Sequence, residues 1–231
     1  MSPQSNGGEP RSPLTAALFG PPGSGKGTQA AFLVEQLKIA QVSTGELFRQ
    51  EVRRGTRLGR QAKEYIDRGE LVPDEITLAM FRERLAKSDC AAGVLLDGFP
   101  RTAAQAEALG AFLHRLGRQM DRVIYIKVPQ DVLVSRLSGR LTCPECGTTY
   151  HPELAPPRQA GLCDRDGGRL FQRDDDAPET ALRRINVYKE QTASVVDYYR
   201  NLGLVAEVDG LGPIEDVRRR TLATVSQSTV G

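Results

Sequence analysis

Short apolar runs and amphipathic segments alternate along most of this 231-residue chain. The apolar runs end in Gly, Ser or Asp and are followed by helix-periodic segments, which is the pattern of βα units that build a parallel sheet. The pattern predicts strands at residues 14–19, 40–43, 93–97, 123–128 and 204–208. It predicts helices at residues 25–37, 45–54, 58–68, 74–86, 102–116, 131–137, 178–201 and 214–225. The fold class is therefore α/β.

One long segment breaks this pattern. Between Leu141 and Asp175 the apolar periodicity disappears, and Pro, Gly, Cys and Asp become frequent. A structureless loop of that length is improbable inside a compact domain, so we expect a small separate module with its own staple. Residues 1–13 and 227–231 also lack periodicity, and we expect both to be disordered tails.

Composition narrows the classes of function. The 31 Lys and Arg residues against 29 Asp and Glu residues leave a net charge of +2, too small to favour a general grip on nucleic acid. No apolar run approaches the roughly 18 residues of a membrane span, and the first residues lack the pattern of a secretory signal. We therefore expect a cytoplasmic protein without a membrane partner. Its four cysteines would stay reduced there, which favours metal binding or packing over disulfides.

A glycine-rich turn follows the first predicted strand. Residues 20–28 read GPPGSGKGT, and an amphipathic helix pattern comes next. Glycines let successive N–H groups point at phosphate oxygens, and the helix start adds partial positive charge. Lys26 would then follow charge on the β and γ phosphates. The general P-loop pattern has Ser or Thr directly after the lysine, whereas here Gly27 intervenes before Thr28, which indicates a subfamily.

This loop resembles the phosphate loop of nucleoside monophosphate kinases, and three further motifs narrow the resemblance to adenylate kinases. They are STGELFR at 43–49, GELVPD at 69–74, and DGFPRT at 97–102 with Gln105 one turn later. The resemblance spans about residues 14–217. It implies a P-loop NTPase-type five-stranded parallel sheet with helices on both faces, and a domain at 14–226. Within it, the core would comprise 14–43, 73–140 and 177–226, with an AMP-binding helical insert at 44–72 and a zinc-stapled lid at 141–176.

The same resemblance implies an activity and assigns residues to it. The activity is reversible, Mg²⁺-dependent transfer of the terminal phosphoryl group of ATP to AMP, giving two ADP, by a monomer whose lid closes over the phosphate loop. The residues implied for AMP are Thr44, Arg49, Glu70, Leu71, Val72, Gly98, Phe99, Pro100, Arg101, Gln105, Arg173 and Arg184. Those implied for ATP are Gly23, Ser24, Gly25, Lys26, Gly27, Thr28, Arg136, Arg140, Thr149, Tyr150 and Gly212, with the turn at 210–213 offering backbone to the base.

Catalysis would fall to the cations, because two polyanions held head to tail need convergent positive charge. The resemblance assigns this role to Lys26, Arg101, Arg140, Arg173 and Arg184. No general base is demanded, because the acceptor is already a phosphate oxygen anion.

Three acidic positions and two arginine runs lie close to these motifs. Asp97 ends an apolar run, where a carboxylate faces the ligand crevice and can hold Mg²⁺ through a water; the alternative is a helix N-cap. Asp175 and Asp176 match acidic family positions, or they form a charged hinge. The arginine runs at 53–54 and 218–220 are interpreted as solvated helix faces.

The cysteines form two matched pairs. Cys143-Pro-Glu-Cys146 and Cys163-Asp-Arg-Asp166 are separated by 16 residues, close to the spacing of a structural zinc site. The fourth position is Asp166, whose carboxylate is an acceptable zinc ligand. His151 as the fourth ligand, and packed cysteines without metal, stay open as alternatives.

One cysteine and one histidine outside these pairs are expected to have structural roles. Cys90 is expected to be a buried hydrophobe, and His114 a structural residue of its helix.

Rival functions remain at this point. One is a related kinase with another monophosphate acceptor or GTP as donor, which Thr44 and Gln105 disfavour; a short-lid UMP/CMP kinase fits less well because the insert is too long. Another is a zinc-ribbon protein that binds nucleic acid. That class predicts basic and aromatic residues interleaved on the ribbon, whereas Tyr150 and Phe171 stand among acidic residues.

Overall fold

A five-stranded parallel sheet forms the centre of the structure, a computed structural model that describes residues 13–226. The strands are β1 (Leu14–Phe19), β2 (Ala40–Ser43), β3 (Gly93–Asp97), β4 (Arg122–Lys127) and β7 (Val205–Asp209), in the order β2-β3-β1-β4-β7. All five predicted strands are confirmed, each within one residue at either end. The tails expected at 1–13 and 227–231 lie outside the described residues, apart from Pro13.

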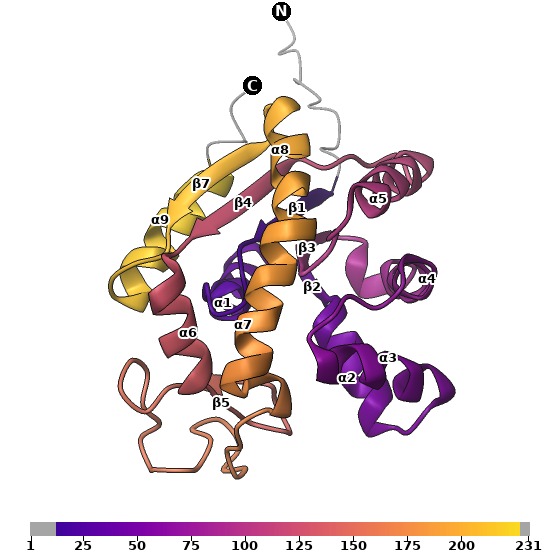
Figure 1. Ribbon diagram of the computed structural model, residues 1–231. Helices are drawn as coiled ribbons and strands as arrows, with labels where there is room; N and C mark the ends of the chain where they lie inside the picture. Colours follow the sequence, from indigo (N-terminus) through magenta and orange to yellow (C-terminus); the bar gives the residue numbers. More distant parts are fainter. Residues whose placement is uncertain (1–12, 227–231) are drawn as a thin grey trace, which may run out of the picture.

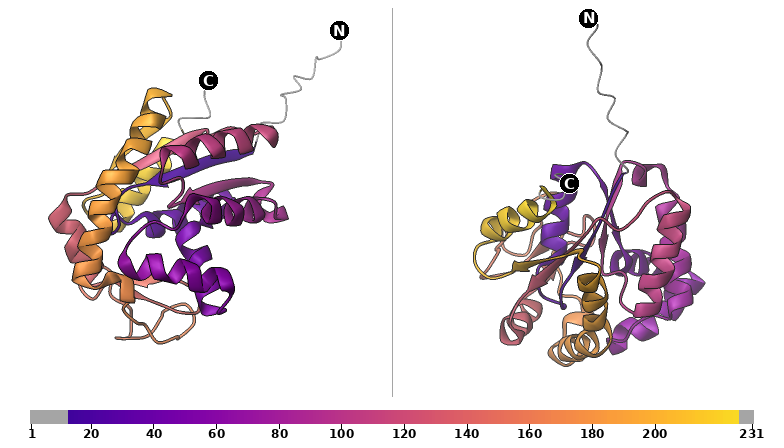
Figure 2. Two further views of the ribbon diagram at one scale, coloured as in Figure 1. Left: turned by 45° about the vertical axis from the view of Figure 1, so that its right-hand side comes forward. Right: turned by 90° about the horizontal axis from the view of Figure 1, so that it is seen from above.

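Helices cover both faces of this sheet (Figures 1 and 2). They are α1 (Lys26–Leu37), α2 (Thr44–Arg53), α3 (Arg57–Arg68), α4 (Asp74–Leu85), α5 (Ala103–Arg115), α6 (Gln130–Ser138), α7 (Pro178–Val187), α8 (Ala193–Asn201) and α9 (Ile214–Ser226). None of the helices within residues 13–226 is long and apolar enough to cross a membrane.

Alternating side chains of the central strand feed two cores. Ala16 and Leu18 of β1 pack with Leu33 of α1 and with α9 on one face, whereas Ala17 and Phe19 pack with α4, α5 and α8 on the other. Successive side chains of a strand point to opposite faces, and a sheet buried on both sides therefore needs an unbroken apolar run. Five of the six residues of Leu14–Phe19 are apolar, and the sixth, Thr15, is completely buried.

The prediction of one helix over 178–201 was wrong in part. The chain is helical throughout, but residues Tyr188–Thr192 form a π-helical turn, η3, between α7 and α8. Its sequence, YKEQT, contains neither Gly nor Pro, so no residue of the pattern marks the interruption.

The strand order creates a crevice at the carboxyl edge of the sheet. The chain leaves β1 toward β2 on one side, and it leaves the neighbouring β3 toward β4 on the other. Ligands of such sheets bind where neighbouring connections diverge. The glycine-rich loop after β1 and Asp97 at the end of β3 therefore meet at this point.

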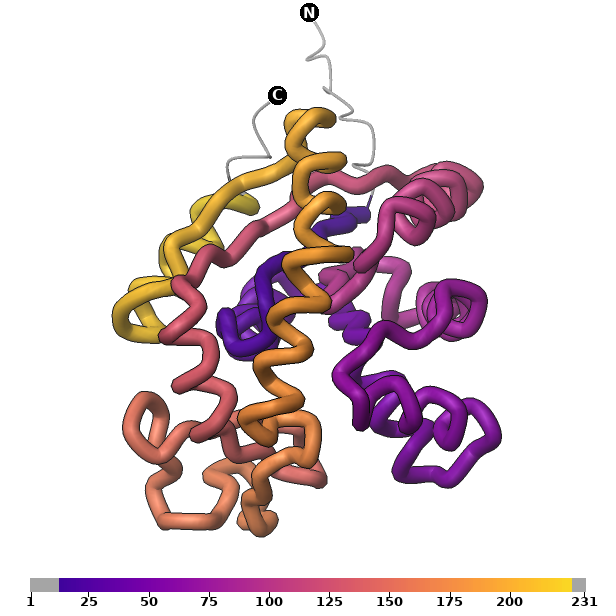
Figure 3. Tube along the Cα trace, viewed as in Figure 1, coloured from indigo at the N-terminus to yellow at the C-terminus, as the bar shows by residue number. Residues whose placement is uncertain are grey.

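Two excursions of the chain extend from the core beyond the carboxyl edge of the sheet (Figure 3). Helices α2 and α3 form a hairpin with a small apolar cluster of its own, in which Phe48, Ala62 and Val72 are buried. The second excursion carries the short strands β5 (Leu141–Thr142) and β6 (Thr149–Tyr150), which pair antiparallel. We call this excursion, residues 141–173, the cysteine module; the chain returns from it to the core through the 3-10 turn η2 (Asp174–Asp176) and α7.

The close packing of α2 on α3 yields a prediction. A Cβ at Gly59 would lie 2.1 Å from the carbonyl oxygen of Glu51, so Gly59→Ala should force the helices apart and cost about 1–3 kcal/mol of stability. Gly110→Ala is the matched control, because a Cβ there meets nothing within 4 Å and helix propensity favours alanine by about 1 kcal/mol. Thermal melts should show opposite shifts, and equal melting temperatures for the two variants would contradict the assigned contact.

Candidate active site

One cavity of about 2120 Å³ lies at the carboxyl edge of the sheet. The phosphate loop, the α2–α3 hairpin, α6, α7 and the cysteine module all contribute residues to its wall. Every residue that the resemblance implied for ATP or AMP lines this cavity, from Gly23 in the phosphate loop to Gly212 after β7. The structure thus brings together residues that are almost 190 positions apart in the sequence.

The phosphate loop depends on glycine at two positions. Gly20 and Gly23 have φ angles of 148° and 84°, and a Cβ on them would lie 2.8 Å from Ile126 O and 2.7 Å from Leu133 O. Helix α1 begins at Lys26 without a side-chain cap, so its first-turn N–H groups remain available to an anion. The loop and the helix start together form an anion-binding site.

Lys26 lies inside this loop. Its Nζ donates hydrogen bonds to Gly20 O at 2.6 Å and Pro21 O at 3.0 Å. Burial lowers the pKa of Lys26 to about 7; the charge of Asp97 acts in the opposite direction, and nearby arginines, Arg101 first among them, add to the lowering. A polyphosphate bound next to Lys26 would place negative charge beside its amino group and so favour the protonated form.

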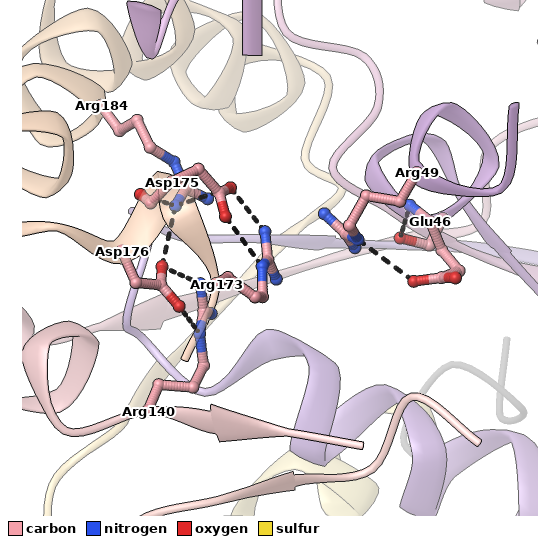
Figure 4. A network of polar contacts seen from close by, with 8 residues as sticks. Glu46, Arg49, Arg140, Arg173, Asp175, Asp176 and Arg184 are labelled. Carbon is pink, nitrogen blue, oxygen red and sulfur yellow. Dashed lines mark hydrogen bonds and ion pairs between the residues drawn. The ribbon is translucent and has the colours of Figure 1, made fainter. Parts of the chain in front are cut away.

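Three arginines are held by two adjacent aspartates of η2 (Figure 4). Arg140 makes a two-pronged contact with Asp176, which is completely buried and also accepts a hydrogen bond from Arg184 at 3.0 Å. Arg173 makes a second two-pronged contact, with Asp175, at 2.8 and 2.6 Å. Asp175 and Asp176 therefore hold the arginine side chains in place. The alternative of a charged hinge does not account for these contacts.

The charges in this network act strongly on one another. Burial opposes ionisation of Asp175, but Arg184 and Arg173 outweigh it and hold the pKa of Asp175 well below its usual range. Burial lowers the pKa of Arg184 to about 10, and that of Arg49 likewise to about 10. Arg49 projects toward this group from α2 and is paired with Glu46 at 3.2 Å (Figure 4).

The wall near α2 and β3 carries the residues implied for AMP. The hydroxyl of Thr44 donates to Gly98 O at 2.9 Å, and Arg101 Nε donates to the same oxygen at 2.7 Å. The side chain of Gln105 is buried. Its Nε2 donates a hydrogen bond to the carboxylate of Asp74 at 2.6 Å, and its Oε1 accepts one from the backbone N–H of Arg101 at 2.7 Å. Gln105 is thus held in one orientation, with one N–H and one lone pair left for a base.

The opposite wall carries residues implied for ATP. Arg136 of α6 donates to Gly210 O at 3.0 Å, just beyond the end of β7. Thr149 and Tyr150 also line the cavity, but the hydroxyl of Tyr150 lies 3.5 Å from Cys163 Sγ and accepts the Asp164 N–H at 2.8 Å. The side chain of Tyr150 therefore packs mainly inside the cysteine module.

The two cysteine pairs fold as matched turns. In the first, Gly147 N donates to Cys143 O and Cys143 N to Thr148 O; in the second, Gly167 and Gly168 repeat both bonds with Cys163. Both Gly147 and Gly167 have positive φ, at 71° and 73°. The repeated geometry aims all four predicted ligand side chains at one point.

The four side chains at that point fit a zinc ion. The ligand atoms of Cys143, Cys146, Cys163 and Asp166 all lie within 4.8 Å of one another. Cys146 Sγ and Cys163 Sγ are 3.5 Å apart, and Cys143 Sγ is 3.3 Å from Asp166 Oδ1. A tetrahedron with metal–sulfur bonds of about 2.3 Å places neighbouring ligands roughly 3.5 to 3.8 Å apart, so the donor set suits zinc in type and spacing.

His151, His114 and Cys90 all lie outside the cluster of four ligand side chains. His151 lies outside the cluster: its Nδ1 accepts the N–H groups of Glu153 and Leu154, and its Nε2 is 3.4 Å from Ser135 O. The prediction of a buried Cys90 is confirmed. His114 is exposed on α5, one position past the face that Leu109 and Leu113 present to the core, so it is no packing residue.

Comparison with known proteins decides the family. The sequence matches the family model described as adenylate kinase over residues 18–204. It is 52% identical over 197 residues to an adenylate kinase of Oceanobacillus iheyensis, covering 85% of this chain and 92% of that protein. It is 50% identical over 204 residues to that of Bacillus subtilis, covering 88% and 94%.

The chain belongs to the adenylate kinase family. It is an enzyme of that family, with the five-stranded parallel sheet and flanking helices that the resemblance implied. A third relative, an adenylate kinase of Salinispora tropica, is 51% identical over 209 residues and is covered to 96% of its length.

The structure of this adenylate kinase family member gives roles to residues to which the resemblance assigned none. Asp74, the last residue of the GELVPD motif and the expected start of a helix, accepts hydrogen bonds from both Gln105 and Thr102 and so fixes the orientation of Gln105. The run at 218–220 is also more than a solvated face, because Arg218 stacks on Phe32 at 5.2 Å and Arg220 contacts backbone carbonyls. The run at 53–54 is exposed, as predicted.

The lowered pKa of Lys26 yields a prediction for nucleotide binding. At pH 8 a lysine with a pKa of about 7 is mostly neutral, and a polyphosphate beside it raises the pKa, so ATP binding should take up about one proton. Titration calorimetry at pH 8 in two buffers of different ionisation enthalpy measures this uptake. Lys26→Met should abolish it, whereas Lys63→Met, at an exposed lysine on α3, should preserve it. Equal uptake by wild type and Lys26→Met would assign the proton to another group.

Proposed function

We propose that this enzyme transfers the terminal phosphoryl group of ATP reversibly to AMP and yields two ADP. The observation that carries the proposal is the convergence of cationic side chains from six separate segments on one cavity: Lys26, Arg49, Arg101, Arg140, Arg173 and Arg184. Such an excess of positive charge suits a reaction that holds two phosphate chains in contact, because their repulsion must be offset.

Each group has a task in this reaction. Lys26 follows the charge of the transferred phosphoryl group, since it lies in the phosphate loop at the start of α1. Arg101 and Arg49 hold the phosphate of AMP, while Arg140, Arg173 and Arg184 surround the group in transfer. The acceptor oxygen is already anionic, so alignment and charge neutralisation suffice without a general base.

In this proposal Mg²⁺ binds together with ATP, the phosphoryl donor. Asp97 ends β3 opposite Leu18 of β1, so it lies in the cavity wall beside the start of the phosphate loop. Its carboxylate would hold Mg²⁺ there through a water. When bound with ATP, the ion neutralises phosphate charge. Gln41 Nε2 lies 3.4 Å from the carboxylate and helps to orient it.

The bases are read by different walls. Gln105, fixed by Asp74, offers a donor and an acceptor to the adenine of AMP, together with Thr44 and the backbone around residues 70–72. Arg136 covers the face of the ATP adenine, next to the backbone of Gly210 and Gly212. A different acceptor or GTP as donor is the second candidate, and the test below distinguishes it.

The cysteine module acts as the lid. Arg173 stands where the module rejoins the core, and Thr149 and Tyr150 bring the module to the cavity wall. Zinc in the Cys143, Cys146, Cys163 and Asp166 site would staple the module without joining the reaction, because four protein ligands leave no open position. The monomeric state and the cytoplasmic location stay predictions.

Acceptor choice tests the function. AMP should exceed GMP, CMP and UMP in kcat/KM by about 100-fold, because a buried polar edge left unpaired costs about 1–3 kcal/mol per group. A coupled assay with each acceptor and with ATP or GTP as donor measures this directly. Lys26→Met should lower kcat at least about 100-fold, which excludes a contaminating kinase. Comparable turnover of UMP would defeat the adenylate assignment.

Metal content tests the lid. We expect about one zinc per chain by elemental analysis, and a lower melting temperature after treatment with a chelator, because structural zinc contributes folding free energy. Asp166→Ala should reduce zinc content more than His151→Ala, since His151 lies outside the cluster. Zinc-free wild type, or zinc loss confined to the His151 variant, would overturn the ligand assignment.

A further inference from the structure

The turn after β7 is held from two opposite sides. On the cavity side, Arg136 Nη2 donates to Gly210 O at 3.0 Å. On the other side, Arg220 of α9 donates through Nη1 to Asp209 O and through Nη2 to Leu211 O at 2.8 Å. The carbonyl groups of residues 209, 210 and 211 therefore alternate in direction. Those of residues 209 and 211 both accept hydrogen bonds from the guanidinium of Arg220.

Arg220 is built into this position. Its Nε donates to Asp216 O at 3.2 Å, one turn back in the same helix, and its Nη1 lies 3.6 Å from the carboxylate of Asp209. The fixed fork of a guanidinium can satisfy several acceptors at once, which an ammonium cannot do with the same geometry. The side chain is partly buried against the turn, at 36% exposure.

The lining of the cavity follows the same alternation. Gly210, Gly212 and Pro213 line the cavity, whereas Asp209, Leu211 and Arg220 are not part of its wall. Gly210 has no room for a side chain, because a Cβ would lie 2.6 Å from Val128 Cγ2, and Gly212 has a φ of 93°. The backbone of these two glycines is thus the surface that the turn offers to the cavity.

We propose that Arg220 is a positioning residue for the base of the phosphoryl donor. Arg220 holds the carbonyls of Asp209 and Leu211 on the side away from the cavity. The backbone of Gly210 and Gly212 therefore stays turned toward the part of the cavity that would receive the base. Adenine presents an amino group to such a backbone wall, and guanine presents an oxo group that repels carbonyl oxygens. Arg220 therefore favours ATP over GTP without touching either nucleotide, and this inference rests on the proposed function.

Kinetics of three variants test this role. Arg220→Ala should raise KM for ATP about tenfold and lower the preference for ATP over GTP in kcat/KM by a similar factor, the size of one lost hydrogen bond. Turnover at saturating ATP and KM for AMP should stay within about twofold. Arg220→Lys should recover part of the preference. Arg219→Ala is the matched control: it removes the neighbouring, exposed arginine and should leave all these values unchanged.

Melting temperatures and direct binding keep the outcome clear. If Arg220→Ala does not fold, the same measurements on Arg220→Lys decide. Equal rises in KM for ATP and GTP together with a lower melting temperature would show a structural role only, and unchanged KM and preference would likewise overturn the inference. Wild type that binds ATP but transfers nothing to AMP would defeat the proposed function instead; ATP and GTP affinities of the variants, measured by calorimetry, would then still test Arg220.

Discussion

Mutual repulsion among cations in one cavity is the constraint that shapes this structure. Two like charges about 4 Å apart repel by about 4 kcal/mol at an effective dielectric constant near 20. Burial is the largest cause of the low pKa values of Lys26, Arg49 and Arg184, about 7, 10 and 10, and neighbouring cations lower them further. The carboxylates of Glu46, Asp97, Asp175 and Asp176 act in the opposite direction on these three cations. The most deeply buried of them, Asp176, accepts hydrogen bonds from two arginines. The cavity can hold so many cations only because these anions are placed among them.

The fold meets the constraint by drawing each cation from a different segment. Lys26 follows β1, Arg101 follows β3, Arg49 stands on α2, Arg140 follows α6, Arg173 precedes η2 and Arg184 lies on α7. The divergence of connections at β1 and β3 brings the first two together. The helix hairpin docks on α7, where Arg183 donates to Arg68 O and a Cβ on Gly69 would lie 3.0 Å from Arg184 Cγ. The π-helical turn begins at Tyr188, which lines the same cavity, a common place for such a turn.

Strands and phosphate loop were predictable because their signals are local. A buried parallel strand needs a continuous apolar run, and the glycines at 20 and 23 are required by φ and by backbone contact, so both leave marks in the sequence. The π-helical turn leaves none, because its side chains continue an ordinary helix pattern. Arg220 was misread for another reason: a run of three arginines on a helix has the composition of a solvated face. Its partners are carbonyl groups, and every residue carries one, so no residue type at any spacing could reveal the contact.

Two groups of contacts hold the cysteine module, one inside it and one at its base. Inside it, the ligand atoms of three cysteines and Asp166 converge at distances that suit a metal ion. At its base, Arg140, Arg173 and Arg184 are held by the oxygens of Asp175 and Asp176. Carboxylate and phosphate both present paired oxygens to the fork of a guanidinium. Under the proposed function, closure can therefore replace one set of oxyanions by another while the arginines stay hydrogen-bonded. Under the same proposal, a metal ion would stiffen the module. Its movement would cost little free energy, because the arginines at its base bind oxyanions both before and after closure.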